Sequence, residues 1–408
     1  MKHLLLVFGL LPALSVNAQT RKVLFIGNSY TYSNDLPNLL RQLALSMGDT
    51  ITVASSAPGG YTFELHTTNA TTQALIAQQA WDFVVLQEQS QIPSFPDAQV
   101  EQDCFPFAAQ LVDSIRAHSP CAEAVFYMTW GRENGDAGNC PNWPPVCTYE
   151  GMQALLRERY LQMAFDNNAF AAPVGVAWKR TRELHPGIAL YVGDGSHPSL
   201  LGSYLIASTL YSTIMRRSCA DATFTAALPA DTALILRTIA TSTVLDSMAV
   251  WNIGVNDPDA AFTSEFTAPC TMQFQSNEAG THTWSFGDGA TSSEPSPLHA
   301  FAPNEGSYTV VHAVTDGCGR TDADTVEVAA CTVGVEEPVR YRPAPVVAGR
   351  TLRFPQLAAS AQVELFNATG AVISRSYGDN MVTVPAGLVI WRVTSPNGAR
   401  TIGRTVIP

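Results

Sequence analysis

Basic side chains are scarce in this sequence. The 408 residues include 23 Lys and Arg against 35 Asp and Glu, which gives a formal net charge of -12 at pH 7. A surface of this sign repels phosphate backbones, so the composition argues against a nucleic acid as partner. The balance is uneven, because residues 333–408 hold eight Arg and only four acidic residues. This change of charge indicates a separate C-terminal module.

Long apolar runs are missing after the first residues. A Met-Lys-His start precedes a short apolar run from Leu4 to Leu14, and Ala18 supplies a small residue for cleavage. Residues 1–18 are therefore predicted to be a signal peptide, and the protein to be secreted or held at the cell surface. A membrane anchor is the alternative, but the run is shorter than the roughly 20 residues that a spanning helix needs. The protein is not expected to span a membrane.

Metal-binding patterns are also missing. The sequence contains no C-x-x-C, no H-E-x-x-H and no pair of His at helical spacing, so no metal and no other cofactor is expected. Its eight cysteines form an even set, and in an exported protein they are expected to form disulfides, whose connectivity the sequence leaves open. Structural zinc is the alternative. The cysteines are Cys104, Cys121, Cys140, Cys147, Cys219, Cys270, Cys318 and Cys331.

Residues 19–256 alternate short apolar runs with longer amphipathic ones. This pattern is typical of a parallel sheet that is buried between helices, and it predicts a three-layer α/β/α domain. The expected strands are Val23–Ile26, Ile51–Ala54, Phe83–Leu86, Ala124–Met128 and Val174–Val176. The expected helices are Leu36–Met47, Thr72–Gln79, Ala98–His118, Tyr149–Phe170, Leu200–Met215 and Thr232–Val250.

Residues 257–333 change to Thr, Ser, Gly and aromatic residues at alternating spacing, which predicts a small antiparallel β domain. Its Trp-Ser-Phe-Gly-Asp-Gly segment, Trp284 to Gly289, and its Gly-Ser-Tyr-Thr-Val-Val segment, Gly306 to Val311, resemble the signature of polycystic-kidney-disease (PKD) domains. The resemblance implies an immunoglobulin-like β-sandwich. Trp284, Phe286 and Tyr308 are expected to fill its core.

Residues 334–348 form a linker that contains Pro and charged residues, and residues 349–408 again read as alternating strands. The last segment, with Val384 to Val393 and a terminal Arg-Thr-Val-Ile-Pro, resembles the C-terminal sorting domain of type IX secretion cargo. It departs from that family in having Arg-Pro-Ala-Pro where Pro-Asn-Pro is usual. The resemblance implies a second small β-sandwich and the type IX secretion machinery as a partner. A plain β-sandwich without that role is the alternative.

Ser29 lies where the first strand passes into a helix, in the segment Gly27-Asn28-Ser29. Such a turn exposes a hydroxyl at the carboxyl edge of a parallel sheet, where ligand sites form. The following helix offers free backbone N–H groups. A serine needs a base, and the base needs a partner that fixes its tautomer. The segment Gly193 to Pro198 supplies both groups, His197 and Asp194, three positions apart.

These features resemble the conserved blocks of the SGNH (GDSL-like) hydrolase superfamily, although Gly-Asn-Ser stands here for Gly-Asp-Ser. The resemblance implies a flavodoxin-like α/β/α fold and a catalytic set of Ser29, Asp194 and His197. It also implies an oxyanion hole made by Ser29, Gly59 and Gln89. Gly60 is the alternative to Gly59.

The third block departs most from the family. The usual Gly-x-Asn-Asp reads Gln-Glu-Gln-Ser here, so Gln89 stands in the place of the Asn whose amide donates to the oxyanion. Gln keeps the amide donor but carries it one methylene farther out. Gln87 is the alternative donor. His66 and His185 are the alternative bases, although each fits a satisfied or solvated side chain better.

The expected activity is that of a secreted serine esterase which hydrolyses short-chain acyl esters, with O-acetyl groups on carbohydrates as substrate. Aromatic residues near strand ends could stack on sugar rings, and ordinary packing in the protein is the alternative. Segment 131–149, with its two cysteines, is expected to be a loop that either shapes substrate choice or only braces the surface. One alternative is a lipase or arylesterase, and another is an inactive glycan- or protein-binding surface protein. The aromatic residues are Tyr30, Tyr32, Tyr61 and Trp130.

Overall fold

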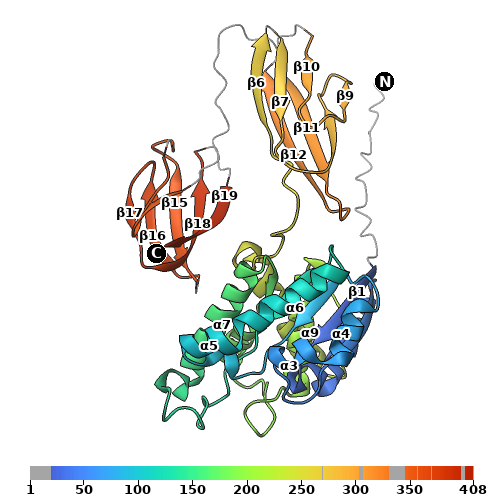
Figure 1. Cartoon of the computed structure of the whole chain (residues 1–408), viewed down its shortest axis with the longest axis vertical. Helices are drawn as coiled ribbons and strands as arrows, with labels where there is room; N and C mark the ends of the chain where they lie inside the picture. Colours follow the sequence, from blue (N-terminus) through green and yellow to red (C-terminus); the bar gives the residue numbers. More distant parts are fainter. Residues whose placement is uncertain are drawn as a thin grey trace, which may run out of the picture.

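A computed structural model of the protein describes residues 20–268, 270–302, 307–329, 345–355, 357–368, 370–396 and 400–407. The predicted signal peptide, residues 1–18, and most of the predicted linker, 334–348, lie outside the described residues. Along the chain an α/β region is followed by two β-rich regions, each with a core of its own (Figure 1).

The α/β region is built on a parallel sheet of five strands. Their order in the sheet is β2-β1-β3-β4-β5, the order of flavodoxin-like folds. β3 and β4 are buried along their whole length, which explains why β3 and the part of β4 after Glu123 form unbroken apolar runs. The strands are β1 (Thr20–Ile26), β2 (Thr50–Ser56), β3 (Phe83–Leu86), β4 (Glu123–Tyr127) and β5 (Phe170–Ala172).

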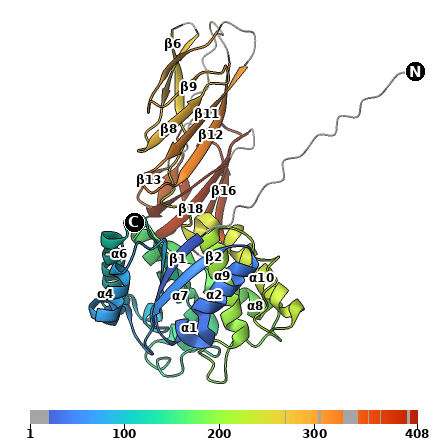
Figure 2. The ribbon, with the colours of Figure 1, turned by 90° about the vertical axis from the view of Figure 1, so that its right-hand side faces the viewer.

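Two groups of helices cover the two faces of this sheet (Figures 1 and 2). The predicted three-layer α/β/α fold is therefore confirmed. One group holds α2 (Leu36–Ser46), α8 (Val174–Leu184), α9 (Leu200–Met215) and α10 (Ala230–Leu245). The other holds α3 (Phe63–Thr68), α4 (Ala70–Ala77), α5 (Asp97–Asp103), α6 (Phe105–His118) and α7 (Tyr149–Asp166).

The strand predicted at Val174–Val176 is wrong. The fifth strand is β5, which ends before Pro173, and Val174 already begins α8. The buried residues of α8 include Val174, Ala177, Trp178 and Thr181, at the spacing of one helical face. A three-residue apolar run cannot by itself distinguish a strand from the first turn of a helix.

The middle β region packs two antiparallel sheets. Trp284 and Phe286 are buried in its core, as predicted, and Tyr308 is partly buried against Phe301 with ring centroids 4.7 Å apart. Gly287 has φ +81°, and a Cβ there would lie 2.6 Å from the carbonyl oxygen of Thr309, so this turn requires glycine. One sheet holds β6 (Thr263–Ala268), β7 (Thr271–Gln275) and β10 (Leu298–Ala300); the other holds β8 (Thr281–Ser285), β9 (Thr291–Ser292), β11 (Ser307–Thr315) and β12 (Thr321–Ala329).

The C-terminal β region also packs two antiparallel sheets around its own apolar core. Trp391 lies over Gly403, where a Cβ would approach the indole to 2.1 Å, so the neighbouring strand must carry glycine at that place. The strands are β13 (Val346–Ala348), β14 (Thr351–Arg353) and β17 (Val382–Thr383) in one sheet, and β15 (Gln362–Asn367), β16 (Val372–Tyr377), β18 (Gly387–Thr394) and β19 (Arg400–Ile407) in the other.

Not all cysteines form disulfides, so that expectation is wrong for two of them. Cys121 bonds to Cys318 and Cys140 to Cys147, and Cys270 is also disulfide-bonded. Cys104 and Cys219 are free and buried. Cys104 Sγ lies 3.7 Å from the sulfur of a core methionine, and Cys219 packs among hydroxyl groups of α9 and α10. Both act as small core side chains.

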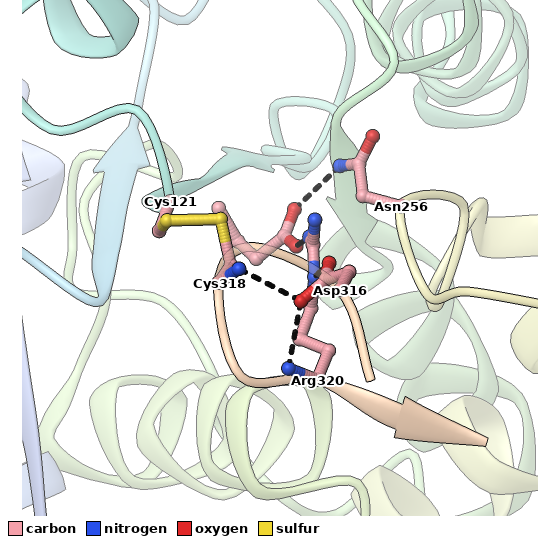
Figure 3. Close-up of a disulfide and its surroundings, with 6 residues drawn as sticks. Cys121, Asn256, Asp316, Cys318 and Arg320 are labelled. Carbon is pink, nitrogen blue, oxygen red and sulfur yellow. Dashed lines mark hydrogen bonds and ion pairs between the residues drawn. A yellow bond between two sulfur atoms is a disulfide. The ribbon is translucent and has the colours of Figure 1, made fainter. Parts of the chain in front are cut away.

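The Cys121–Cys318 disulfide joins the α/β region to the middle β region (Figure 3). Cys121 precedes β4, and Cys318 lies in the turn between β11 and β12. Beside the disulfide, Arg320 donates to the buried carboxylate of Glu123 over 2.5 Å and to Asp316 over 2.7 Å. The disulfide and the hydrogen bonds of Arg320 are together called the interdomain clasp. The clasp lies at the edge of the parallel sheet where the strands begin.

Candidate active site

Ser29 stands on a tight turn at the carboxyl end of β1. The strand ends at Ile26, and Ser29 is the first residue of the short helix α1 (Ser29–Tyr32). A Cβ on Gly27 would lie 2.4 Å from the hydroxyl of Thr31 and 2.6 Å from Oε1 of Gln87. The turn therefore requires glycine before the serine, because these side chains close over the backbone.

Asn28 fixes this turn, a role that its sequence context alone did not predict. Its Oδ1 accepts the Tyr30 N–H at 3.2 Å and caps α1. Its Nδ2 donates to the carbonyl oxygen of Tyr61 over 2.9 Å, which ties the serine turn to the loop after β2. A buried amide thus takes the place of the usual aspartate. The asparagine in the Gly-Asn-Ser segment was the sequence signal that could have revealed this role.

Gln87 completes the same network from the end of β3. Its Oε1 accepts the backbone N–H of Asn28 at 2.9 Å and the hydroxyl of Thr31 at 2.8 Å. Its Nε2 donates to Asn28 Oδ1 over 2.9 Å and to the carbonyl oxygen of Glu88 over 2.6 Å. Both amide protons are used and the side chain is buried. Gln87 therefore holds the serine turn and has no proton left for an oxyanion.

Ser29, His197 and Asp194 are joined by hydrogen bonds. His197 Nε2 lies 2.8 Å from Ser29 Oγ, and His197 Nδ1 lies 2.6 Å from Asp194 Oδ2. The other carboxylate oxygen of Asp194 accepts the backbone N–H groups of Ser196 at 2.8 Å and His197 at 2.9 Å. This arrangement presents a hydroxyl to the nitrogen of an imidazole whose far nitrogen faces a carboxylate.

The Asp194 carboxyl is held in its ionised form. Desolvation acts to raise its pKa, but the hydrogen bonds from the His197 ring and from the backbone N–H groups of Ser196 and His197 outweigh it and lower the pKa below its ordinary value. The side chains of His197 and Asp194 are 38% and 47% exposed, so the site is open to solvent.

A stack of aromatic rings supports the histidine loop. The Tyr30 ring lies 4.7 Å from Trp130, which lies 3.9 Å from Trp178. The Tyr30 hydroxyl is 2.6 Å from Ser196 Oγ, and Trp130 Nε1 donates to the Ser196 carbonyl oxygen over 3.1 Å. Tyr30 and Trp130 are buried, so for these two the alternative of ordinary packing is confirmed and neither is available to stack on a sugar. Of the four aromatic residues, only Tyr32 is exposed, at 55%.

The expected oxyanion donors lie on the two loops that flank the serine turn. Gly59 is exposed in the loop after β2, where a Cβ would be 3.6 Å from the Tyr32 hydroxyl, and Gly60 has φ +73°. Gln89 follows β3 and is partly buried. Within the described part of the chain, no hydrogen bond joins Gly59 or Gln89 to Ser29 itself.

Among the described residues, neither alternative base is hydrogen-bonded to Ser29 Oγ, whose partner is His197. His66 is buried, with Nε2 2.8 Å from the Gly27 carbonyl oxygen and Nδ1 2.8 Å from the Thr72 hydroxyl. Burial lowers its pKa, although the bond to Gly27 opposes this shift. His185 ends α8. His66 is thus a satisfied core side chain.

Glu88 is a buried carboxyl that sequence reasoning missed. It accepts the backbone N–H of Phe63 at 3.0 Å and also the backbone N–H of Gln89, so it joins the loop after β2 to the loop after β3. Desolvation raises its pKa to about 8, the two backbone hydrogen bonds oppose the shift, and the charge of nearby Glu64 adds to it. The carboxyl is therefore protonated at neutral pH and bridges the two loops without a buried charge.

Replacing Glu88 by Gln is expected to make the stability of the protein less dependent on pH. Between 4.5, the ordinary pKa, and about 8, the folded protein holds a proton that the unfolded chain has released. Stability of the wild type therefore falls as pH rises through this window, by about 1.4 kcal/mol per pH unit, and the loss is complete above the folded pKa. Thermal unfolding followed by circular dichroism at several pH values measures the difference.

The matched control for this experiment is Glu101→Gln, at an exposed position of α5. Its unfolding temperature should follow that of the wild type at every pH. If the Glu88→Gln and wild-type curves also ran parallel, Glu88 would have the same pKa folded and unfolded, and its assignment as a protonated bridge would be wrong.

The described residues were searched for clusters of metal-binding side chains and for membrane-spanning helices. They contain no group of three or more His, Cys, Asp or Glu side chains able to hold a metal ion. No helix formed by these residues is both long and apolar enough to cross a bilayer.

Comparison with known proteins divides the chain in the same way as its architecture. The PKD domain family model matches residues 255–330. A protein from Slackia heliotrinireducens described as a "putative SGNH hydrolase" is 31% identical, with 48% of this chain and 98% of that chain covered and a TM-score of 0.40. No curated protein matches the chain.

Two other solved structures are similar to parts of the chain. A DUF4886 family protein from Bacteroides uniformis is 18% identical, with 55% of this chain and 95% of that chain covered and a TM-score of 0.48. The PKD1 domain of a Vibrio cholerae metalloprotease is 27% identical, with 19% and 99% covered and a TM-score of 0.18. The identity to the Slackia protein over nearly all of that chain, together with the match to the PKD model, shows that this chain belongs to the SGNH hydrolases through its α/β region and carries a PKD domain after it.

Proposed function

We propose that the protein is a serine ester hydrolase in which Ser29 is the nucleophile. The observation that carries this proposal is the continuous set of hydrogen bonds from Ser29 Oγ through the His197 ring to Asp194. His197 Nε2 takes the hydroxyl proton as Oγ attacks the ester carbonyl carbon, and Asp194 stabilises the imidazolium that forms. The proton then passes to the leaving alcohol, and an acyl group remains on Ser29.

Water completes the cycle by the same route. His197 Nε2 takes a proton from a water molecule that attacks the acyl carbon, the bond to Ser29 Oγ breaks, and the proton returns to Oγ as the acid leaves. Each tetrahedral intermediate carries a negative oxygen that needs donors. Ser29 and Gly59 supply backbone N–H groups in this proposal, and Gln89 supplies its side-chain amide.

The Gln89→Ala variant is expected to lower kcat by about 100- to 1000-fold with little change in KM. The reason is that an oxyanion donor acts mainly on the transition state. Steady-state kinetics on an aryl acetate measures both constants. The matched control is Gln99→Ala, an exposed glutamine of α5 that lies outside the site. A change confined to KM would instead make Gln89 a substrate-binding residue.

We further propose that the substrate carries short acyl groups, with O-acetyl groups on carbohydrates as the preferred class. Tyr32, at the end of the helix that begins with Ser29, presents an exposed aromatic ring suited to stacking on a sugar. Rates on acetyl, butyryl and long-chain aryl esters, followed by acetate release from acetylated polysaccharide, test this. A rate that rises steadily with acyl length, without acetate release, would favour a lipase or arylesterase.

The competing class is a binding protein in which the α/β region is inactive and the PKD domain contacts a glycan or protein. The hydrolysis of a chromogenic acetate ester separates the two classes, because an adhesin should not exceed the background rate.

Disulfides and a PKD domain are consistent with an extracellular protein. We propose export through residues 1–18 and sorting by the type IX machinery through the C-terminal region. The mass of the exported protein tests the removal of residues 1–18 and shows whether the C-terminal region is removed as well.

A further inference from the structure

A chain of hydrogen bonds runs from a buried carboxylate to the proposed oxyanion donor. Asp136 Oδ2 accepts from Gln91 Nε2 at 2.6 Å, and Gln91 Oε1 accepts from Gln89 Nε2 at 3.1 Å. Gln89 Oε1 in turn accepts the backbone N–H of Gln91 at 2.8 Å. The three side chains come from two segments, residues 89–91 after β3 and residue 136 in the loop after β4.

The direction of this chain follows from the chemistry of its end. An ionised carboxylate can only accept hydrogen bonds, so Gln91 must turn its Nε2 toward Asp136. The Oε1 of Gln91 then faces Gln89, so Gln89 must turn its Nε2 toward that oxygen to donate a hydrogen bond. One proton of the Gln89 amide is used in this way, and no second acceptor contacts Nε2 among the described residues. The remaining proton is free for an oxyanion.

Asp136 is well suited to hold this orientation because it is itself fixed. Its side chain is fully buried, and it accepts from Asn139 Nδ2 at 2.7 Å and from Arg132 at 3.2 Å. Desolvation acts to raise the pKa of the carboxyl, but the hydrogen bonds from Gln91 and Asn139 and the charge of Arg132 lower it. The carboxylate therefore stays ionised.

The backbone around Asp136 is tied to the small disulfide loop. The Asp136 N–H donates to the Val146 carbonyl oxygen over 2.7 Å, and the Asp136 carbonyl oxygen accepts the Cys140 N–H at 2.9 Å. Cys140 and Cys147 close this loop covalently.

The same segment also touches the histidine loop, since the backbone N–H of Glu133 donates to the Gly195 carbonyl oxygen over 2.8 Å. It thus contacts the loops that carry Gln89 and His197.

We propose that Asp136 is a positioning residue that acts through Gln91 to orient the amide of Gln89 toward the oxyanion. This inference rests on the proposed function, because it needs Gln89 to be the oxyanion donor. It also gives segment 131–149 a defined role, in which the segment holds the donor and the histidine loop in one arrangement.

The test is a double-mutant cycle on the full-length protein. Asp136→Asn, which can offer an amide donor to Gln91 and release its orientation, should lower kcat on an aryl acetate by roughly 10- to 100-fold while KM stays nearly constant. Gln91→Ala should do the same while leaving the other bonds of Asp136 in place. In a Gln89→Ala background, neither change should reduce kcat further, because its effect passes through the absent amide.

The control is Asn142→Ala, at an exposed position of the same disulfide loop and outside this chain of hydrogen bonds, and it should keep kcat near the wild-type value. If Asp136→Asn and Gln91→Ala lowered kcat as much in the Gln89→Ala background as in the wild type, the positioning role would be wrong. If Ser29→Ala retained full turnover, the proposed function would fail first, so the two failures are distinguishable.

Discussion

The Ser29→Ala and His197→Ala variants are each expected to lose at least about 10⁴-fold in kcat on an aryl acetate while keeping the fold. Either change removes one end of the hydrogen bond that carries the hydroxyl proton to the imidazole, in which Ser29 Oγ and His197 Nε2 lie 2.8 Å apart. Steady-state kinetics measures the loss, and labelling with a fluorophosphonate followed by peptide mapping should mark Ser29 in the wild type and nothing in its alanine variant.

The double variant is expected to be no slower than the single ones, because the two residues act as one unit. Losses that multiply would contradict a shared proton path. Asp194→Asn should keep more activity, since an amide oxygen can still accept the two backbone N–H groups that hold the loop. His118→Ala, at an exposed position at the end of α6, is the matched control and should behave as the wild type.

The parts of the site that the sequence could predict are those that depend on local context. A serine directly after a buried strand, and an Asp-x-x-His just before a helix, mark two places at one edge of a parallel sheet. The structure joins these residues by hydrogen bonds, and their catalytic roles stay a prediction. The three layers follow from the same periodic pattern, apart from the apolar run after Pro173, whereas the flavodoxin-like order of the strands was implied only by the family resemblance.

The parts that the sequence could not predict are contacts between distant polar residues. Gln91 and Asp136 are 45 positions apart and meet only because β3 and β4 are neighbours in the sheet. Glu88 stands between two glutamines of the third block, where the sequence gives no sign of its burial, and only that burial makes it a bridge. The pairing of Cys121 with Cys318 depends on how two regions dock. No periodicity carries that information.

Opening the interdomain clasp by Cys121→Ser with Cys318→Ser is expected to uncouple the PKD domain from the α/β region. The disulfide joins residues 197 positions apart, and in the chain-entropy account a crosslink of that span contributes about 5 kcal/mol. The ion pair between Arg320 and the buried Glu123 remains, but unlike the disulfide it places no constraint on the unfolded chain. Calorimetry should therefore show two unfolding transitions for the double variant where the wild type shows one, and the first of the two should occur at a lower temperature.

Esterase turnover should survive this change at temperatures below the first transition. Cys121 precedes β4 and Ser29 follows β1, so the clasp and the site lie at opposite edges of the sheet, about 16 Å apart along a five-residue strand. The matched control removes the other bridge: Cys140→Ser with Cys147→Ser should leave a single transition, because both sulfurs belong to one loop of the α/β region. A clasp variant that still unfolded in one step at the wild-type temperature would show that noncovalent contacts alone unite the two regions.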